Sequence, residues 1–354
     1  ILADYWISFI FFTHLTLLFN NNHYICNLNK KKVNKQIYQQ NHKAMNKIIS
    51  KEQFSEKVFK LEIEAPLIAK SRRAGHFVIV RVDEKGERMP LTIAGSNLEK
   101  GTITLVVQTV GLSSTKLCNL NEGDYVLDVV GPLGQATHIQ NYGTVVCAGG
   151  GVGVAPMLPI IQGCKAAGNR VISVVAGRSK DLIILEEEVR ASSDEVIIMT
   201  DDGSYGTKGL VTEGIESVIK REKVDKCFAI GPAIMMKFCC LLTKKYEIPT
   251  DVSLNTIMVD GTGMCGACRI TVGGKTKFVC VDGPEFDGHQ VDFDEMFKRM
   301  GSFKDVEREE MSHLEQHVCK VEPQVEAKKA ECKPCSEKAC QMPMEELLDR
   351  KAPW

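Results

Sequence analysis

The N-terminal half of the chain alternates between apolar and polar residues in short runs between residues 48 and 130. Alternation with a period of two is typical of strands that bury one face, and glycines stand between the runs. Short strands at this spacing predict a small antiparallel β barrel. The clearest runs are residues 58–64, 77–82 and 102–107.

The period changes at Thr144, where a continuous apolar run predicts a buried strand over residues 144–148. A glycine-rich turn follows, and then a helix is expected to about Ala167. Strand, glycine turn and helix are the setting in which a dinucleotide pyrophosphate approaches the backbone. The alternative is a tight turn that binds nothing. The candidate nucleotide-binding residues are Gly149, Gly150, Gly151, Gly153 and Pro156.

Further strands and helices alternate after this turn, which predicts a Rossmann-like parallel sheet. Strands are expected over 171–176, 195–200 and 227–230, and helices over 182–190, 209–222 and 232–246. Because ligands bind beyond the carboxyl ends of such strands, the residues there should converge on one crevice. Asp-Gly turns are also ordinary turn chemistry, which is the competing explanation for the two aspartates. These further candidates are Asp201, Asp202, Gly231 and Pro232.

The most specific motif is a glycine-framed set of cysteines near residue 265. The spacing is D-x4-C-x2-C-x11-C, and the β-prone residues 269–279 predict a hairpin that returns the last cysteine to the turn. A plant-type [2Fe–2S] site has the pattern C-x4-C-x2-C…C, so an aspartate stands where the first thiolate is expected. Zinc and a purely structural turn are the alternatives. The candidate ligands are Asp260, Cys265, Cys268 and Cys280.

Two loops inside the β region carry groups that suit a phosphate or a flavin. One is polar and hydroxyl-rich at the start of a predicted helix, where backbone N–H groups are free to bind an anion. Taken alone, this pattern is more typical of an ordinary N-capped helix. The residues of the two loops are Arg88, Pro90, Leu91 and Thr92, and Gly111, Ser113, Ser114 and Thr115.

Composition and charge narrow the class of protein. The 354 residues have a formal net charge of −1, which gives no reason to expect a nucleic acid or an anionic membrane as partner. Fourteen cysteines without a convincing secretion signal predict a reducing, cytoplasmic location. No hydrolytic triad or paired-carboxylate pattern is evident, so no side chain is expected to act as a catalytic nucleophile or base.

Both ends of the sequence differ in composition from residues 45–300. Residues 1–44 begin with an apolar run and continue rich in Asn, Lys and Gln, so we expect an atypical extension ahead of Met45, with a membrane anchor as the weaker alternative. Residues 301–354 are highly charged, which predicts an exposed linker or helix. The sequence stops within this charged run, so we expect that it is truncated. This tail carries a second cysteine group, whose metal binding the spacing leaves open: Cys319, Cys332, Cys335 and Cys340.

The order of β barrel, nucleotide-binding α/β domain and [2Fe–2S] loop resembles the ferredoxin-NADP reductase superfamily. Residues 45–300 are similar to two kinds of iron–sulfur flavoprotein subunit. One is the electron-transfer subunit of NAD-dependent dihydroorotate dehydrogenase, and the other is the small subunit of NADH-dependent ferredoxin:NADP oxidoreductase, also described as a sulfide dehydrogenase subunit. Asp260 and the block 259–268 resemble the second kind more closely.

The resemblance implies FAD in the barrel, with Pro90-Leu91-Thr92 at the flavin ring and the Gly111–Thr115 loop at its pyrophosphate. Here Leu91 replaces the usual aromatic residue, and Ile230 replaces the cysteine before Gly231-Pro232. The implied domains are an FAD-binding barrel (45–140), an NAD-binding domain (141–248) and a cluster domain (249–300).

The function implied by the resemblance is oxidation of NADH through FAD, with single electrons passing through the [2Fe–2S] cluster to a larger catalytic subunit. Two alternatives stay open. The same cofactors would serve dihydroorotate oxidation in pyrimidine biosynthesis, or the chain is a non-catalytic iron–sulfur adaptor. Nothing in the residues decides between NADH and NADPH, and Arg178 and Lys180 follow the second strand of the nucleotide domain.

Overall fold

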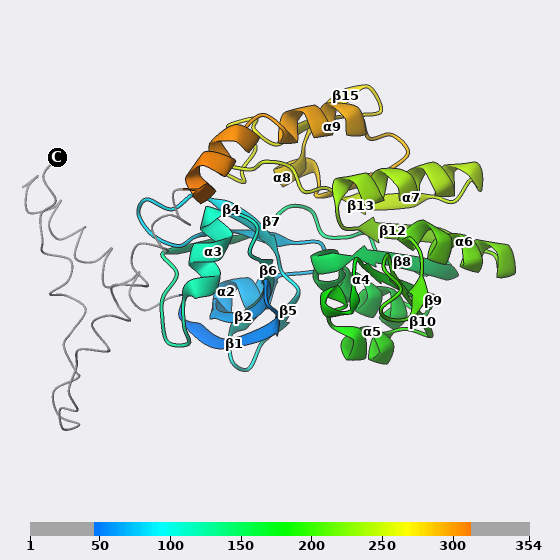
Figure 1. Cartoon of the computed structure of the whole chain (residues 1–354), viewed down its shortest axis with the longest axis horizontal. Helices are drawn as coiled ribbons and strands as arrows, with labels where there is room; N and C mark the ends of the chain where they lie inside the picture. Colours follow the sequence, from blue (N-terminus) through cyan, green and yellow to red (C-terminus); the bar gives the residue numbers. More distant parts are fainter. Residues whose placement is uncertain (1–45, 313–354) are drawn as a thin grey trace, which may run out of the picture. The chain divides into compact units, whose positions relative to one another are not determined.

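The computed structural model describes residues 46–312 (Figure 1). The predictions for residues 1–44 and for Cys319, Cys332, Cys335 and Cys340 lie outside this range. Within it, no helix has the length and apolar composition that crossing a membrane requires. The chain divides into two units between Ser302 and Phe303, and residues 304–312 of the second unit are helical.

The alternating region forms two antiparallel sheets around one apolar core. The four-stranded sheet has the order β1-β2-β6-β5 and the three-stranded sheet the order β4-β3-β7. Every second residue of β2 and β6 points into the core, as the alternation predicts. The bounds are β1 (Ile48–Ser55), β2 (Val58–Glu64), α2 (Pro66–Ser71), β3 (Phe77–Arg81), β4 (Met89–Thr92), β5 (Gly95–Asn97), β6 (Thr102–Gln108), α3 (Leu112–Asn119) and β7 (Asp128–Leu133).

The predicted antiparallel β barrel is therefore confirmed only in part, because hydrogen bonds do not join the described strands into one closed ring. The chain changes sheets at Ile93 and Ala94, between β4 and β5. The N–H of Ile93 donates to the carbonyl of His76 beside β3, and the N–H of Ala94 donates to the carbonyl of Thr104 in β6. One continuous segment thus forms a corner between two short-stranded sheets.

The second half is built on a seven-stranded sheet with the order β11-β10-β9-β8-β12-β13-β16, parallel except for β16. Its helices cover both faces: α4 and α5 share a core with one face, and α6 and α7 with the other. The bounds are β8 (Thr144–Gly150), α4 (Val154–Ala166), β9 (Arg170–Gly177), α5 (Glu186–Ser192), β10 (Glu195–Thr200), β11 (Thr207–Lys208), α6 (Val211–Arg221), β12 (Lys226–Ile230), α7 (Ala233–Lys245), β13 (Thr250–Ser253) and β16 (Glu285–Asp287).

The expected elements of this half are present with one shifted boundary. A helix was expected from residue 182, but a short 3-10 turn, η2 (Lys180–Leu182), comes first and α5 begins at Glu186. Leu185 has a left-handed backbone, with φ of 55°, so an α-helix cannot run through it. A similar 3-10 turn, η1 (Gly151–Gly153), joins β8 to α4.

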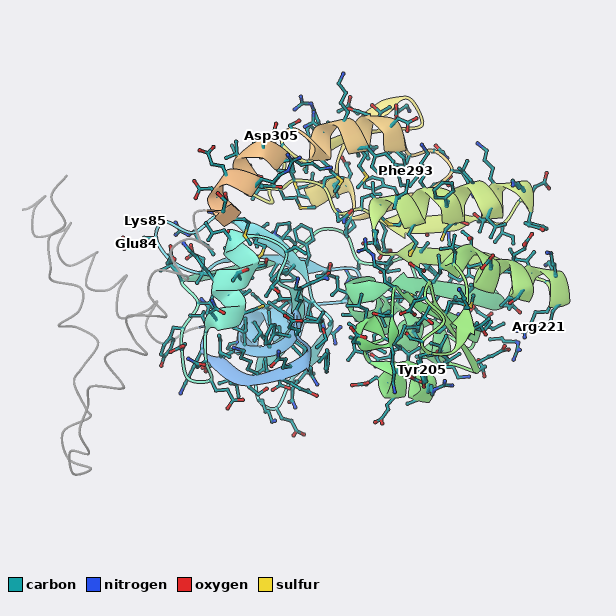
Figure 2. All side chains as sticks on the ribbon, viewed as in Figure 1. Glu84, Lys85, Tyr205, Arg221, Phe293 and Asp305 are labelled. Atoms are coloured by element: carbon teal, nitrogen blue, oxygen red, sulfur yellow. The ribbon has the colours of Figure 1, made fainter. Side chains whose placement is uncertain are left out.

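The cysteine-rich region is a small layer of its own elements. It consists of the hairpin β14 (Arg269–Val272) and β15 (Lys275–Phe278), the short helix α8 (Val279–Asp282) and α9 (Phe293–Met300). Phe293, labelled in Figure 2 at the start of α9, is buried with Met296 in a core that includes α7. Because β13 hydrogen-bonds within the seven-stranded sheet, we propose that the cluster domain begins after Leu254, with β16 returning from it to the edge of that sheet.

Candidate functional site

The hairpin returns two of the predicted thiols to each other. β14 and β15 pair antiparallel with Arg269 opposite Phe278, so the residues on either side of the hairpin meet. The sulfur of Cys268 lies 3.3 Å from the sulfur of Cys280, and both thiols are buried. The N–H of Val279 also donates to the carbonyl of Cys268, at 3.3 Å, which fixes the two segments side by side.

The other two predicted ligands are arranged differently. The thiol of Cys265 is exposed. The carboxylate of Asp260 accepts hydrogen bonds from the N–H groups of Thr262, at 2.9 Å, and Cys265, at 2.8 Å. These backbone hydrogen bonds, that of Thr262 first, lower the pKa of Asp260. Within residues 46–312, no three His, Cys, Asp or Glu side chains are grouped to hold a metal. Ligation by Asp260 and Cys265 therefore stays a prediction.

The residues present fit an iron–sulfur cluster on chemical grounds. Burial, with the adjoining thiol of Cys268, raises the pKa of Cys280 to about 12. Thiolates are the form that binds a metal, so two buried neighbouring thiolates need a positively charged centre beside them. The backbone also has positive φ at Gly261, Gly263 and Gly266, which lets the loop wrap closely around such a centre.

Helix α9 makes side-chain hydrogen bonds to the backbone of the cysteine-rich region. The guanidinium of Arg299 donates to the carbonyl of Ala267, between the two cysteines of the C-x2-C turn, at 2.9 Å. The carboxylate of Glu295 accepts from the N–H of Thr271 in β14, at 2.9 Å. Both bonds satisfy backbone groups of the cysteine-rich region, so α9 holds the turn in place.

The two predicted flavin loops lie next to each other. Thr92, at the end of β4, pairs with Phe77 of β3. The hydroxyl of Ser113 donates to the carboxylate of Glu87 at 3.0 Å, which places the start of α3 beside the segment that leads to Arg88. The hydroxyl of Ser114 instead accepts from the N–H groups of Val110 and Gly111, both at 3.0 Å. Ser114 thus caps its own helix, and its contact with a phosphate stays a prediction.

The glycine turn lies where the strand order of the large sheet reverses. β8 has β9 on one side and β12 on the other, so Gly149 and Gly150 stand at the switch point. A Cβ on Gly153 would lie 2.4 Å from the carbonyl oxygen of Ile230, so only glycine fits this approach to β12. A Cβ on Gly151 would meet nothing within 4 Å, which leaves this side of the turn open to a ligand.

The carboxyl ends of the neighbouring strands meet at the same edge, as predicted. Gly149 lies opposite Ile230, directly before Gly231-Pro232, and Thr200 lies opposite Gly177. Asp201 and Asp202 follow Thr200 and are exposed. The carboxylate of Asp202 accepts from the N–H of Ser204 at 2.8 Å, and hydrogen bonding by Ser204 lowers the pKa of Asp202. Asp202 therefore has the turn role that the sequence offered as the alternative.

The three candidate sites adjoin one another. Ala94 and Val106 of the β region share an apolar core with Val154 and Met157 of α4, directly after the glycine turn. A Cβ on Gly261 would lie 2.7 Å from Cδ1 of Leu133. The cysteine loop therefore packs directly on the sheet that contains β4, and the nucleotide turn lies beside the same β region.

Comparison with known proteins identifies the cysteine region. Residues 255–292 match the model of the iron–sulfur cluster binding domain of dihydroorotate dehydrogenase B. The chain is 49% identical over 265 residues, 75% of this chain and 94% of the relative, to a Thermotoga maritima protein named as a homologue of the dihydroorotate dehydrogenase B (NAD(+)) electron transfer subunit. The electron transfer subunit of Desulforamulus reducens is 32% identical and is covered over 91% of its length.

Comparison with solved structures also finds a similar oxidoreductase. A chain from the structure of an NADH-dependent reduced ferredoxin-NADP oxidoreductase, described in relation to flavin-based electron bifurcation, superposes with a TM-score of 0.74. It is 46% identical, and the match covers 77% of this chain and 98% of that chain. The ferredoxin reductase of carbazole 1,9a-dioxygenase, at 15% identity and a TM-score of 0.50, shares the fold alone.

The fold and the cysteine loop define an iron–sulfur flavoprotein oxidoreductase of the ferredoxin reductase type. The chain belongs to the family of dihydroorotate dehydrogenase B electron transfer subunits and their homologues. The resemblance expected from the sequence is confirmed, and the similarities support the predicted set of FAD, NAD(H) and an iron–sulfur cluster.

Several residues that organise the site were not found from the sequence. Arg299 and Glu295 brace the cysteine region, but they lie 31 and 27 residues from Cys268 in a charged helix. Their helical spacing of four was visible, although it is also typical of an ordinary exposed face. Gln135 and Thr137 lie in a loop without a motif, and only the fold shows their partners, Val281 after Cys280 and Glu285 of β16.

Proposed function

We propose that this protein oxidises NADH through bound FAD and passes electrons one at a time through a [2Fe–2S] cluster to a larger partner subunit. The observation that carries the proposal is the packing of the cysteine loop on the flavin-side sheet, where Gly261 adjoins Leu133 and Ile79. When bound, a flavin takes the two electrons and one proton of a hydride from NADH, and the cluster relays both electrons singly to one-electron acceptors.

The chain's own residues would position these groups. The N–H groups around Gly151 and the start of α4 would hold the pyrophosphate of the nucleotide. Thr92 and the turn at Gly111 would hold the flavin and its pyrophosphate. Cys268 and Cys280, with Cys265 and Asp260, would hold the cluster, and α9 would keep their loop ordered.

The choice of NADH over NADPH rests on the names of the relatives, which include NAD(+) and NADH. A 2′-phosphate would need a basic group after the second strand of the nucleotide domain. Lys180 is near that position, but its ammonium lies 5.5 Å from the ring centroid of Tyr205. This cation–π contact gives the lysine a structural role, whereas Arg178, directly after β9, is exposed. We therefore propose NADH as the donor on the names of the relatives alone.

The acceptor separates two versions of the proposal. The structural relative with 46% identity and the aspartate at position 260 favour a ferredoxin:NADP oxidoreductase type of complex. The matched cluster domain and the Thermotoga maritima relative favour delivery to a dihydroorotate dehydrogenase subunit. We propose the first as the function and keep the second as the alternative.

Steady-state reduction of ferricyanide, a one-electron acceptor, tests the proposal. The full chain, purified without oxygen and assayed for flavin and iron, should reduce ferricyanide with NADH at a kcat/KM at least about tenfold above that with NADPH, which corresponds to about 1.4 kcal/mol. Flavin and iron without NADH oxidation would contradict the proposal and favour a non-catalytic adaptor. Equal use of NADPH would contradict only the nucleotide preference.

A further inference from the structure

The connection between the two halves of the protein makes hydrogen bonds to the segment after Cys280 through two of its residues, Gln135 and Thr137. β7 ends at Leu133 and β8 begins at Thr144, so residues 134–143 link the flavin side to the nucleotide side. The backbone N–H of Gln135 donates to the carbonyl of Gly283, at 2.6 Å, and the side-chain amide of Gln135 donates to the carbonyl of Val281, at 2.8 Å. Val281 directly follows Cys280.

A second pair of bonds extends the contact. The hydroxyl of Thr137 donates to the carboxylate of Glu285, at the start of β16, at 2.7 Å. The backbone N–H of Thr137 donates to the carbonyl of Ala74, at 2.9 Å, and Ala74 lies on the flavin side between α2 and β3. The same short segment therefore bonds to the flavin side, to the residues that follow Cys280 and to β16 at the edge of the seven-stranded sheet.

The segments pack too closely at Gly134 for a side chain. A Cβ on Gly134 would lie 2.9 Å from the ring of Phe77 and 3.0 Å from the carbonyl oxygen of Gly283. Gly134 also has a φ of 79°, which a residue with a side chain rarely adopts. Gly134 thus lies between Phe77 of β3 and the segment after Cys280, and β3 pairs with the predicted flavin strand β4.

We propose that Gln135 and Thr137 are positioning residues, which hold the segment after Cys280 at a fixed distance from the flavin side. This inference rests on the proposed function. Electrons pass from flavin to cluster only at short range, and the cluster loop has to be kept there while nucleotide and partner bind and leave. Three hydrogen bonds from these two residues tie the cluster segment to the loop that both halves share.

A stopped-flow experiment with the full chain tests the proposal. Gln135→Ala combined with Thr137→Val removes both side-chain bonds. Gln290→Ala is the matched control, because its amide donates a bond of 2.7 Å to Asp287 of β16 and not to the loop 134–143. In the double variant, NADH should reduce the flavin at the wild-type rate and flavin and iron contents should be unchanged. Reduction of the cluster should be several-fold slower, since the rate of electron transfer falls as the distance between flavin and cluster grows.

Two variants of Glu285 test the bond to Thr137 from its other partner. Glu285→Gln keeps an acceptor for the hydroxyl of Thr137 and should retain the wild-type rate of cluster reduction, whereas Glu285→Ala should slow it. Slow cluster reduction in Glu285→Gln as well, or a slower flavin reduction in every variant, would contradict a positioning role.

Hydrogen–deuterium exchange supplies a readout that does not depend on activity. Exchange at residues 281–285 should rise in the Gln135→Ala, Thr137→Val variant and stay unchanged in Gln290→Ala. Unchanged exchange in the double variant would overturn the proposed contact. If exchange rises as expected but NADH fails to reduce the wild-type cluster, the proposed function is wrong while the contact between the segments is upheld.

Discussion

At the scale of single residues, Asp260 is both a predicted cluster ligand and a hydrogen-bond acceptor for the backbone of its own loop. Its carboxylate occupies the place of the first cysteine in the plant-type pattern. The same carboxylate accepts from the backbone at Thr262 and Cys265, and so it also shapes the loop. A ligand and a loop-organising residue respond differently to replacement by a thiol.

Asp260→Cys should retain a [2Fe–2S] centre with a shifted reduction potential, because the atom bound to iron changes. An EPR-monitored redox titration measures the shift, with Asp282→Cys as a control. Asp282 accepts from the N–H of Phe278 at 2.7 Å in the same region but is not a predicted ligand. An unchanged potential in Asp260→Cys would remove Asp260 from the ligand set and leave it the loop role alone.

Glu285 is a second residue for which the protonation state affects the protein, here its stability. Burial is the main reason that the pKa of Glu285 rises from 4.5 to about 7; the hydrogen bond from Thr137 opposes this rise, Asp251 adds to it and Lys226 opposes it. Lys226 itself pairs with Asp251 at 2.7 Å. The groups that face this carboxyl are Thr137, Lys226, Asp251, Tyr142 and Cys164.

Because the folded state raises this pKa, it holds the proton more tightly than the unfolded state does. The resulting stabilisation is complete below pH 4.5 and is lost as the pH rises through 7. It amounts to at most about 3 kcal/mol. Glu285→Gln should therefore gain stability relative to the wild type between pH 5 and pH 8, as measured by the unfolding midpoint in urea. A difference that does not change with pH would contradict this assignment.

At the scale of elements, α9 is expected to keep the cysteine turn ordered through Arg299. Arg299→Ala removes the hydrogen bond to the carbonyl of Ala267 and should speed the loss of iron to a chelator several-fold. Lys298→Ala changes an exposed neighbour on the same helix and should not. Equal rates of iron loss in the two variants would show that the hydrogen bond from Arg299 to Ala267 does not protect the cluster.

The glycine turn of β8 and α4 makes a steric prediction. In Gly153→Ala the new methyl would meet the carbonyl oxygen of Ile230, so the turn must shift, at a cost of about 1–3 kcal/mol, and NADH should bind more weakly. Gly95→Ala, in β5, adds the same methyl at an ordinary contact distance of 3.4 Å from Thr104 and should leave NADH binding unchanged. Calorimetry and a fluorescence titration with NADH measure both effects, and unchanged NADH binding in Gly153→Ala would contradict the role of this turn.

The elements were largely predictable because their signals are local. The period of two in β2 and β6 and the glycine turn after β8 depend on neighbouring residues, and both are found as expected. The start of α5 was missed because the left-handed backbone at Leu185 has no mark in the sequence. The predicted β barrel is present only as two sheets, because the change of sheet at Ile93 and Ala94 depends on hydrogen bonds to distant strands.

At the scale of the whole molecule, the sequence predicted which residues carry chemistry better than how the parts meet. The spacing of Cys268 and Cys280 implied their approach, and the structure brings the two sulfurs within 3.3 Å. The contacts of Gln135 and Thr137 join segments about 146 residues apart, and no local pattern announces a bond over that separation.

The central claim is that one chain joins a nucleotide site, a flavin and a cluster in a single electron path. The most direct test is an anaerobic visible and EPR spectrum of the purified full chain before and after NADH, with flavin and iron assayed on the same sample. We predict one flavin and two irons per chain, with the flavin bleached and a reduced [2Fe–2S] signal appearing after NADH. A chain that holds both groups but shows no change in either after NADH would contradict the account.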